Sequence, residues 1–210
     1  MPVVPSDALK ARKTPRQARS SATVAAIHEA TFQVLLSDGI GKLTTTRVAE
    51  RAGVSVGTMY QYFPHKQALL YAVLDEYLEH VVFAVEEACT RLSGARLVEL
   101  SDGLAQAYLD AKLRHMPASL ALYAVAADLD TASLVADVVQ RVDRAVERLL
   151  ASAADATFDD IGKVTFALRT MLVGTVRAGL ENDASPGTLA MLRSQLPVMC
   201  RAYLMVAARS

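Results

Sequence analysis

The chain of 210 residues is 52% hydrophobic, has 10 glycines and 7 prolines, and carries no net charge. Such a chain is long enough for one domain or two small ones with a sizeable core, and its few glycines and prolines favour helices over short strands. No charge-free stretch reaches the ~18 residues of a membrane span, and no apolar core follows the basic N-terminus, so we expect neither a membrane helix nor a signal peptide.

Residues 1–19 contain three prolines and five basic side chains, and we expect them to form a flexible basic arm. Residues 1–70 hold nine Lys or Arg and four acids, whereas the remaining chain holds 13 and 18. A basic end on an acidic body indicates contact with a polyanion, and such an arm could enter a DNA minor groove. A solubilising tail is the alternative, and charge alone does not separate the two.

After the arm, the sequence predicts an all-α protein of about nine helices. The first helix ends at Asp38-Gly39, where glycine accepts a left-handed conformation, and the second follows the capping oxygens of Thr44–Thr46. Ser55 is placed to cap the third helix, and a break is expected at Met116-Pro117. The expected helices are about 21–37, a short one ending near 52, 56–62, 66–92, 97–115, 118–128, 131–154, 159–182 and 187–208.

The segment GVSVGTMYQYFPHK, residues 53–66, is rich in hydroxyl and aromatic groups and contains no acid. Two short helices joined by a glycine turn are typical of a helix-turn-helix, in which Gly53 supplies the positive φ and the small Ala49 lets the helices approach. Four side chains have the spacing that fills the wedge between them: Val48, Ala52, Val54 and Met59. The outer face is left to Val56, Gly57, Thr58, Tyr60, Gln61 and Tyr62.

This outer face suits the DNA major groove. It has no carboxylates to repel phosphates, its hydroxyls can donate to phosphate oxygens, and its methyl groups can touch thymine. The hydroxyls of Thr44, Thr45 and Thr46 and the amine of Lys66 flank the helix and are expected to hold phosphates, helped by positive helix N-termini. Alternatives stay open, since the two tyrosines could pack against the first helix, Thr45 could serve only as a cap, and Lys66 could be merely solvated.

The stretch LTTTRVAERAGVSVGTMYQYFPHKQALL resembles the DNA-binding domain of the TetR family of bacterial one-component transcriptional regulators, over about residues 21–72. The resemblance implies a DNA-binding domain at 20–66 and a helical effector-binding and dimerisation domain at 67–210. The family's DNA-contact positions fall on Thr45, Val56, Gly57, Thr58, Tyr60, Tyr62 and Lys66. His65 departs from the pattern, because the family usually has a good helix cap such as Asn or Ser there.

The resemblance also implies a repressor that binds a palindromic operator as a homodimer and leaves it when a small hydrophobic effector binds. Two recognition helices related by a two-fold axis read half-sites about one turn, ~34 Å, apart. The last two helices would pair with their copies as a four-helix bundle, through Gly174, Ala178, Gly179, Ala190, Leu196, Val198 and Leu204. For each of these residues, ordinary packing within one chain is the alternative.

An effector pocket would lie, by the same resemblance, among helices four to eight. Its candidate lining is mostly aliphatic or aromatic, which favours a hydrophobic effector: Tyr77, Val81, Tyr108, Met116, Leu120, Tyr123, Phe166, Arg169 and Leu172. Arg169 is a lone cation in the apolar stretch TFALRTMLVG. It would pair with an anionic group of a ligand, or it is a snorkelling or ion-paired side chain of the protein.

The sequence contains no catalytic or metal-binding pattern, so we expect no enzyme, metal or cofactor. The four histidines do not combine with carboxylates or cysteines at metal spacing, and a structural or surface role is expected for them. Cys89 and Cys200 are expected to be buried thiols in a reducing cytoplasm. Two other classes stay open: a ligand-independent DNA-binding activator or architectural protein, and a small-molecule carrier or enzyme on a helical body.

Overall fold

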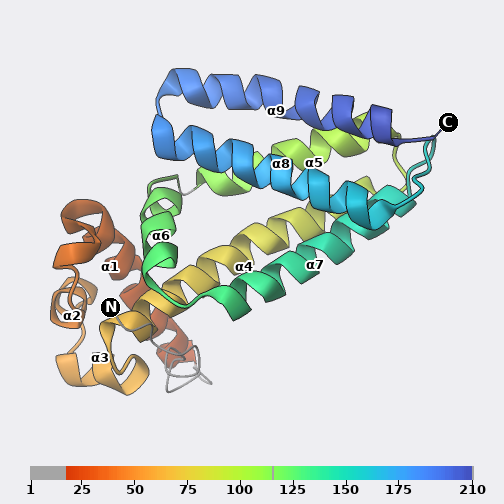
Figure 1. The fold of residues 1–210 in the computed structure, drawn as a ribbon. Helices are drawn as coiled ribbons and strands as arrows, with labels where there is room; N and C mark the ends of the chain where they lie inside the picture. The colour runs from red at the N-terminus through yellow and green to blue at the C-terminus, as the bar shows by residue number, and fades with distance from the viewer. Residues whose placement is uncertain (1–17, 115, 210) are drawn as a thin grey trace. The chain divides into compact units, whose positions relative to one another are not determined.

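A computed structural model describes residues 18–114 and 116–209, and these residues form nine helices, as the sequence predicts (Figure 1). The helices are α1 Ala18–Lys42, α2 Thr45–Ala52, α3 Val56–Tyr62, α4 Lys66–Leu92, α5 Leu97–Arg114, α6 Met116–Asp128, α7 Ala132–Ala151, α8 Ile161–Asn182 and α9 Pro186–Ala207. The predicted basic arm at 1–19 falls almost wholly outside the described residues.

Most helix ends lie within a few residues of their predicted positions, and two places differ. Gly39, with φ 75°, interrupts α1 where the sequence predicts an end, but one more turn follows to Lys42. The break expected at Met116-Pro117 lies slightly earlier, because α5 ends at Arg114 and α6 already begins at Met116. A proline fits the first turn of a helix, where its missing N–H would have no intrahelical acceptor.

The described residues pack as two compact units. Unit 1 comprises residues 18–78 and 116–135, and unit 2 comprises residues 79–114 and 136–209. Unit 1 contains α1, α2, α3, the first turns of α4, and α6, so it takes in more of the chain than the DNA-binding domain expected at 20–66. The helix α4 crosses the division, since it runs from Lys66 to Leu92.

Unit 1 is built on α1, which packs against α2 and α6, while α2 packs against α3. Its buried apolar side chains include Ile27, Val34, Leu43, Val48, Met59, Phe63, Leu69 and Val73. Full burial of one such side chain contributes about 1.5–3 kcal/mol, so this small core is enough to hold two helices as short as α2 and α3 in place. A hydrogen bond between the hydroxyls of Tyr77 and Ser119 joins α4 to α6 within the unit.

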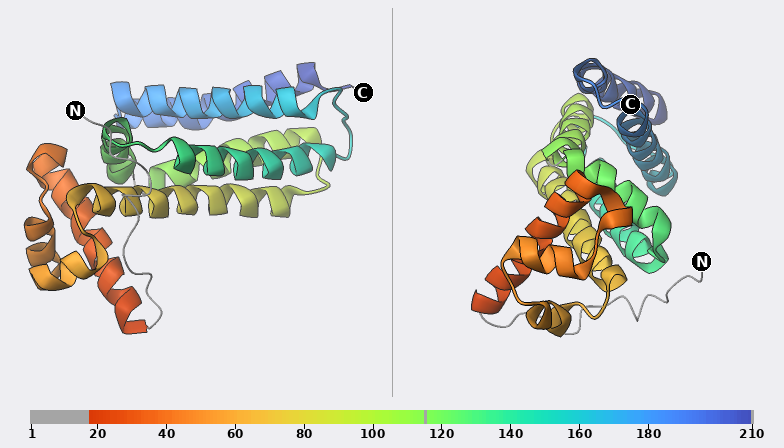
Figure 2. Two further views of the ribbon diagram at one scale, coloured as in Figure 1. Left: turned by 60° about the horizontal axis from the view of Figure 1, so that its bottom comes forward. Right: turned by 90° about the vertical axis from the view of Figure 1, so that its left-hand side faces the viewer.

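In unit 2, α9 packs against both α5 and α8, and the three helices lie side by side (Figures 1 and 2). Two ion pairs join α9 to α5: Arg193 with Asp110 at 2.8 Å and Arg201 with Asp102 at 2.6 Å. The two arginines and the two aspartates are each about two helical turns apart and follow in opposite order along the chain, as two antiparallel helices require.

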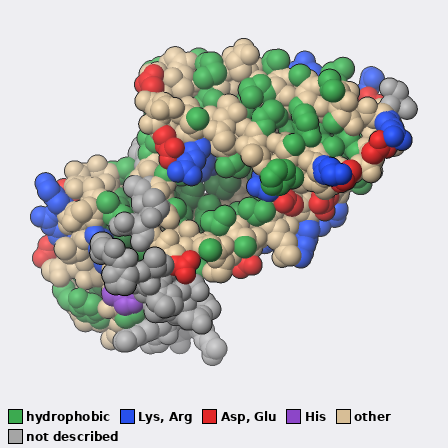
Figure 3. All heavy atoms as spheres, in the orientation of Figure 1, with side chains coloured by type: hydrophobic (Ala, Val, Ile, Leu, Met, Phe, Trp, Pro, Cys, Tyr) green, Lys and Arg blue, Asp and Glu red, His purple; other side chains and the backbone are tan. Residues whose placement is uncertain are grey.

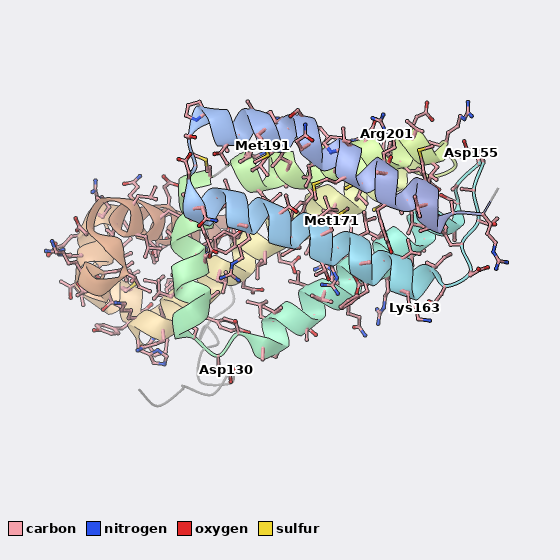
Figure 4. All side chains as sticks on the ribbon, turned by 45° about the horizontal axis from the view of Figure 1, so that its top comes forward. Asp130, Asp155, Lys163, Met171, Met191 and Arg201 are labelled. Atoms are coloured by element: carbon pink, nitrogen blue, oxygen red, sulfur yellow. The ribbon has the colours of Figure 1, made fainter. Side chains whose placement is uncertain are left out.

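The loop between α7 and α8 holds the start of α5. Asp155 accepts hydrogen bonds from the backbone N–H of Leu97 at 2.7 Å and from Nε of Arg96 at 3.0 Å. The hydrogen bond from the backbone N–H of Leu97 lowers the pKa of the Asp155 carboxyl most, and the one from Arg96 lowers it further. Figure 4 shows Asp155 in this loop and Arg201 on α9 toward the same end of the unit.

Candidate nucleic-acid interface

The turn between α2 and α3 has the geometry that the sequence predicts. Gly53 is left-handed, with φ 67° and ψ 29°, and its N–H donates to the carbonyl of Glu50 at 3.2 Å. The N–H of Val54 donates to the carbonyl of Ala49 at 3.0 Å, so the two hydrogen bonds close the C-terminus of α2. Of the four residues predicted to fill the wedge, Val48 and Met59 are fully buried, whereas Ala52 and Val54 are half-buried. The small Ala49 is fully buried as well.

Hydroxyl side chains cap both short helices. The Oγ1 of Thr44 accepts from the N–H of Arg47 at 3.2 Å and caps α2, while the Oγ of Ser55 accepts from the N–H of Thr58 at 3.0 Å and caps α3. The Oγ of Ser55 also lies 2.8 Å from Oγ1 of Thr58. Such caps contribute about 1 kcal/mol each, and they fix where α2 and α3 begin.

The outer surface of α3 carries five of the ten predicted contact residues. Val56, Gly57, Tyr60 and Gln61 are exposed, and Thr58 is half-buried. Thr44 and Thr46 are exposed beside them at the start of α2, whereas Thr45 is buried. The hydroxyl of Thr45 donates to that of Tyr60 at 3.3 Å, so it orients the tyrosine.

Tyr62 and Lys66 lie differently from what the pattern of the outer face predicts. Tyr62 is buried, and its hydroxyl forms a 3.0 Å hydrogen bond with Oγ of Ser20 on α1. Packing against the first helix was the alternative left open for this residue, and it is the arrangement observed. Lys66 is half-buried, and its Nζ donates to the carbonyl of Ile40 at 2.5 Å. The ammonium therefore holds the end of α1 and is not simply a solvated charge.

His65 is the cap of α4, in spite of its departure from the family pattern. Its Nδ1 accepts from the N–H of Ala68 at 3.1 Å, the position at which an Asn or Ser oxygen would accept. The imidazole nitrogen can take this role because an unprotonated ring nitrogen is an acceptor. The start of α4 therefore has a side-chain cap.

The candidate pocket residues are divided between the two units. Tyr77, Met116, Leu120 and Tyr123 belong to unit 1, and Val81, Tyr108, Phe166, Arg169 and Leu172 belong to unit 2. Burial raises the pKa of Tyr77, and its hydrogen bond with Ser119 opposes that shift. Phe166 is 61% exposed, so within one chain it does not line an interior space.

Arg169 is ion-paired, which is the alternative that the sequence left open. Its Nε donates to Oδ1 of Asp143 on α7 at 2.7 Å, and its guanidinium lies 5.4 Å from the ring centre of Phe166. The cation buried in unit 2 is instead Lys112 on α5, which is 5% exposed. Burial, and then the charge of Arg177, lower the pKa of Lys112 to about 8. Sequence reasoning missed this residue because it stands among charged neighbours in LDAKLR.

The candidate dimer residues fall into three groups. Gly174, Ala178, Ala190 and Val198 are exposed. Leu196 and Leu204 are fully buried within unit 2, so they pack inside one chain. A Cβ on Gly179 would lie 3.0 Å from Cδ1 of Leu192, so this glycine serves the close approach of α8 to α9.

An apolar stripe lies on the exposed sides of α8 and α9. On α8 it contains Phe166 and Val173, and on α9 it contains Met191, Val198 and Met205. Seven residues separate successive members, which places those of each helix on one face. Figure 3 shows hydrophobic side chains gathered over these two helices, and Figure 4 shows Met191 on α9.

Two negative findings concern other kinds of site. Within the described ranges, no helix combines the length and apolar character needed to cross a bilayer. The same residues contain no group of three His, Cys, Asp or Glu that could hold a metal ion.

Comparisons with known proteins agree with this geometry. The family described as "Bacterial regulatory proteins, tetR family" matches residues 27–73, and that described as "Tetracyclin repressor-like, C-terminal domain" matches residues 96–204. No curated protein matched the chain.

Several solved structures share the fold. A protein of unknown function from Rhodococcus sp. RHA1 has a TM-score of 0.68 and 21% identity, covering 89% of this chain and 96% of its own. A TetR-family transcriptional regulator from Streptomyces coelicolor has a TM-score of 0.62 and 22% identity, covering 88% and 99%. A transcriptional regulator from Aquifex aeolicus VF5 has a TM-score of 0.64 and 14% identity, covering 84% and 99%. With the C-terminal match alone spanning half of its length, the chain belongs to the TetR family of bacterial transcriptional regulators.

Proposed function

We propose that the protein is a cytoplasmic repressor that binds a palindromic DNA operator as a homodimer and is released by a small hydrophobic effector. The observation that carries the proposal is the surface of α3. Its exposed side chains are an apolar group, a phenol and an amide without any acid, and they are held by a buried wedge and two capped helices.

Readout of bases would rest on the middle of α3. Gln61 has an amide that can pair with a base edge, and Val56 has methyl groups that can touch thymine. Tyr60 is oriented by Thr45, and a pre-oriented side chain loses less freedom on binding. The exposed hydroxyls of Thr44 and Thr46 would meet phosphates, which position the protein without reading the sequence.

DNA binding is tested with the purified protein on its upstream intergenic DNA and on a selected pool of sequences, over a series of salt concentrations. We expect a specific complex whose affinity falls steeply as salt rises. Gln61→Ala should cost about 1–3 kcal/mol on the specific site and little on random DNA. Gln140→Ala, at an exposed glutamine on α7, is the matched control. If no sequence is preferred and Gln61→Ala changes nothing, the operator proposal is rejected.

The homodimer proposal is supported by the apolar stripe on α8 and α9. The five large apolar side chains of the stripe stay exposed on two adjacent helices of one chain, and a second copy related by a two-fold axis would cover such a surface. Gly174 and Ala178 lie exposed on α8, where small residues allow two helices to approach closely.

A matched pair of substitutions tests this interface. Val198 on α9 is 51% exposed and Val135 on α7 is 44% exposed, so a glutamate at either site meets water in a monomer. Val198→Glu should shift the protein from dimer to monomer in analytical ultracentrifugation, whereas Val135→Glu should leave the dimer intact. A dimer that withstands Val198→Glu as well as the control would place the interface elsewhere.

The effector proposal is supported by the character of the candidate lining residues, which are apolar or phenolic apart from the ion-paired Arg169. Binding in the body would move α4 and so change the separation of the recognition helices. A coupling of about 1–3 kcal/mol per site changes operator affinity by one to two orders of magnitude. When the operator complex is titrated with a library of lipophilic compounds, at least one class of compound should release the DNA. A library that never changes operator affinity would favour ligand-independent binding.

A further inference from the structure

His28 on α1 makes a three-way contact in unit 1. Its side chain is buried, with Nδ1 hydrogen-bonded to Oε2 of Glu76 on α4. Its ring packs against Phe63 at the end of α3, with 5.6 Å between ring centres. Phe63 is itself fully buried, and its N–H donates to the carbonyl of Met59, the last hydrogen bond of α3. One imidazole therefore touches α1, the end of the recognition helix, and α4.

The two nitrogens of this imidazole differ in their hydrogen bonding. A carboxylate only accepts hydrogen bonds, so the N–H at Nδ1 is the donor and Oε2 of Glu76 is the acceptor. The other nitrogen, Nε2, is buried and has no hydrogen-bond partner. A buried polar atom without a partner destabilises the fold, so packing alone would be better served by an apolar ring at this position. The feature that the imidazole adds over such a ring is the hydrogen bond to Glu76.

Glu76 lies far along α4 from the joint between α3 and α4. Ten residues separate it from Lys66, the first residue of α4, which is about 15 Å along a helix. A contact at the joint resists rotation of α1–α3 against α4 weakly, because it has almost no lever arm. A contact about 15 Å away resists it strongly. Apolar contacts are also non-directional, so two surfaces can slide while they stay in contact. A hydrogen bond weakens when the angle at its hydrogen departs from near-linear, so it resists such movement.

We propose that His28 is a positioning residue for operator binding, which locks α1–α3 to α4 through Glu76 and Phe63 and so sets the separation of the two recognition helices in the dimer. The inference rests on the proposed function. The helix α4 continues into unit 2, which carries the proposed dimer interface. The recognition helix α3 is therefore linked to the dimer through α4. A looser lock leaves each α3 able to bind a half-site but holds the pair less firmly at operator spacing.

The test compares His28→Phe with wild type on three DNAs: the palindromic operator, the same operator with one base pair added to its spacer, and a single half-site. Phenylalanine keeps the ring on Phe63 and removes the unpartnered nitrogen, so the melting temperature should change by only a few degrees. We expect about tenfold weaker binding to the palindrome, reduced discrimination against the longer spacer, and half-site affinity unchanged within about twofold.

Two further variants make the result specific. Glu76→Gln keeps an acceptor for Nδ1 and should behave as wild type, whereas Glu76→Ala should reproduce His28→Phe. The side chain of Glu76 is 43% exposed, so its loss does not endanger the fold and decides the question if His28→Phe fails to fold. His80→Phe, at an exposed histidine on α4, is the control for the substitution itself.

Each outcome has a different meaning. If His28→Phe and Glu76→Ala keep wild-type affinity and spacer discrimination, the positioning role is overturned. If both lose half-site and palindrome binding equally, His28 merely supports the fold of α3, and the positioning role is overturned as well. If wild type binds no DNA specifically, the proposed function itself fails, and that result is visible before any variant is measured.

Discussion

Replacement of Lys112 by methionine should make the protein more stable at neutral pH. Lys112 is 5% exposed on α5, so its ammonium is taken out of water when the chain folds. This burial, and then the charge of Arg177, lower the pKa of the side chain from 10.5 to about 8. Methionine has a similar unbranched shape and carries no charge, so it removes the electrostatic cost while it fills the same space.

The magnitude follows from the two pKa values. In the unfolded chain the pKa of Lys112 keeps its ordinary value of 10.5, so the folded state binds this proton more weakly than the unfolded state does. The gap corresponds to roughly 3 kcal/mol of destabilisation, which is fully present below pH 8 and disappears as the pH rises from 8 to 10.5. The stability advantage of Lys112→Met should therefore shrink by roughly 2 kcal/mol between pH 8 and pH 10.

Urea unfolding at one fixed protein concentration, repeated from pH 7 to pH 10, measures this slope. The fixed concentration matters because the stability of a dimer depends on it. The slope is a cleaner test than the stability at one pH, since packing changes caused by methionine do not vary with pH. Lys163→Met is the control, because Lys163 is exposed and its pKa is raised by Asp160, so its contribution stays constant over this range.

A flat difference between Lys112→Met and wild type from pH 7 to pH 10 would refute the reasoning. It would mean that the ammonium stays solvated or is matched by an anion in the folded protein.

Three further predictions test the local geometry. Gly53→Ala should destabilise the protein by about 1 kcal/mol in urea unfolding, because its left-handed φ disfavours a side chain although space is free, whereas Gly41→Ala, also with free space but without a positive φ, should not. His65→Ala should cost about 1 kcal/mol by loss of the α4 cap, and His65→Asn should restore it; equal stability of the two would contradict the cap. Burial raises the pKa of Cys89 to about 11 and that of Cys200 to about 12, so at pH 8 both thiols should react with a disulfide reagent only after unfolding, and rapid reaction of the native protein would contradict their burial.

The helical segments and the helix-turn-helix could be predicted because their signals are local. Capping hydroxyls at Thr44 and Ser55 and the left-handed Gly53 act on backbone groups within four residues. The partners of these interactions lie close together in the sequence, so one sequence is enough to identify them. His65 marks the limit of this kind of pattern, since an unusual residue supplies the expected hydrogen bond by a different atom.

The direction in which a side chain points was less predictable wherever a distant element decided it. Tyr62 has the spacing of an outer-face residue, yet it is buried in the core of unit 1 and its hydroxyl is hydrogen-bonded to Ser20. Arg169 has an apolar context that suggests a buried cation, but Asp143 on another helix pairs with it. Lys112 has a charged context that suggests exposure, and it is buried. In each case the partner is separated by tens of residues or is an entire packed surface.

By itself the sequence predicted the helices of the described residues, with most of their ends to within a few residues, and it predicts that α3 bears a surface suited to DNA. Periodicity of 3.6 residues defines the faces of each helix, but it does not state which neighbour a face will meet. The tertiary structure decided that Leu196 and Leu204 pack within one chain while Val198 and Met205 stay exposed. It also brought His28, Phe63 and Glu76 together across 48 residues, because only the packed chain places α1, the end of α3 and α4 against the same side chain.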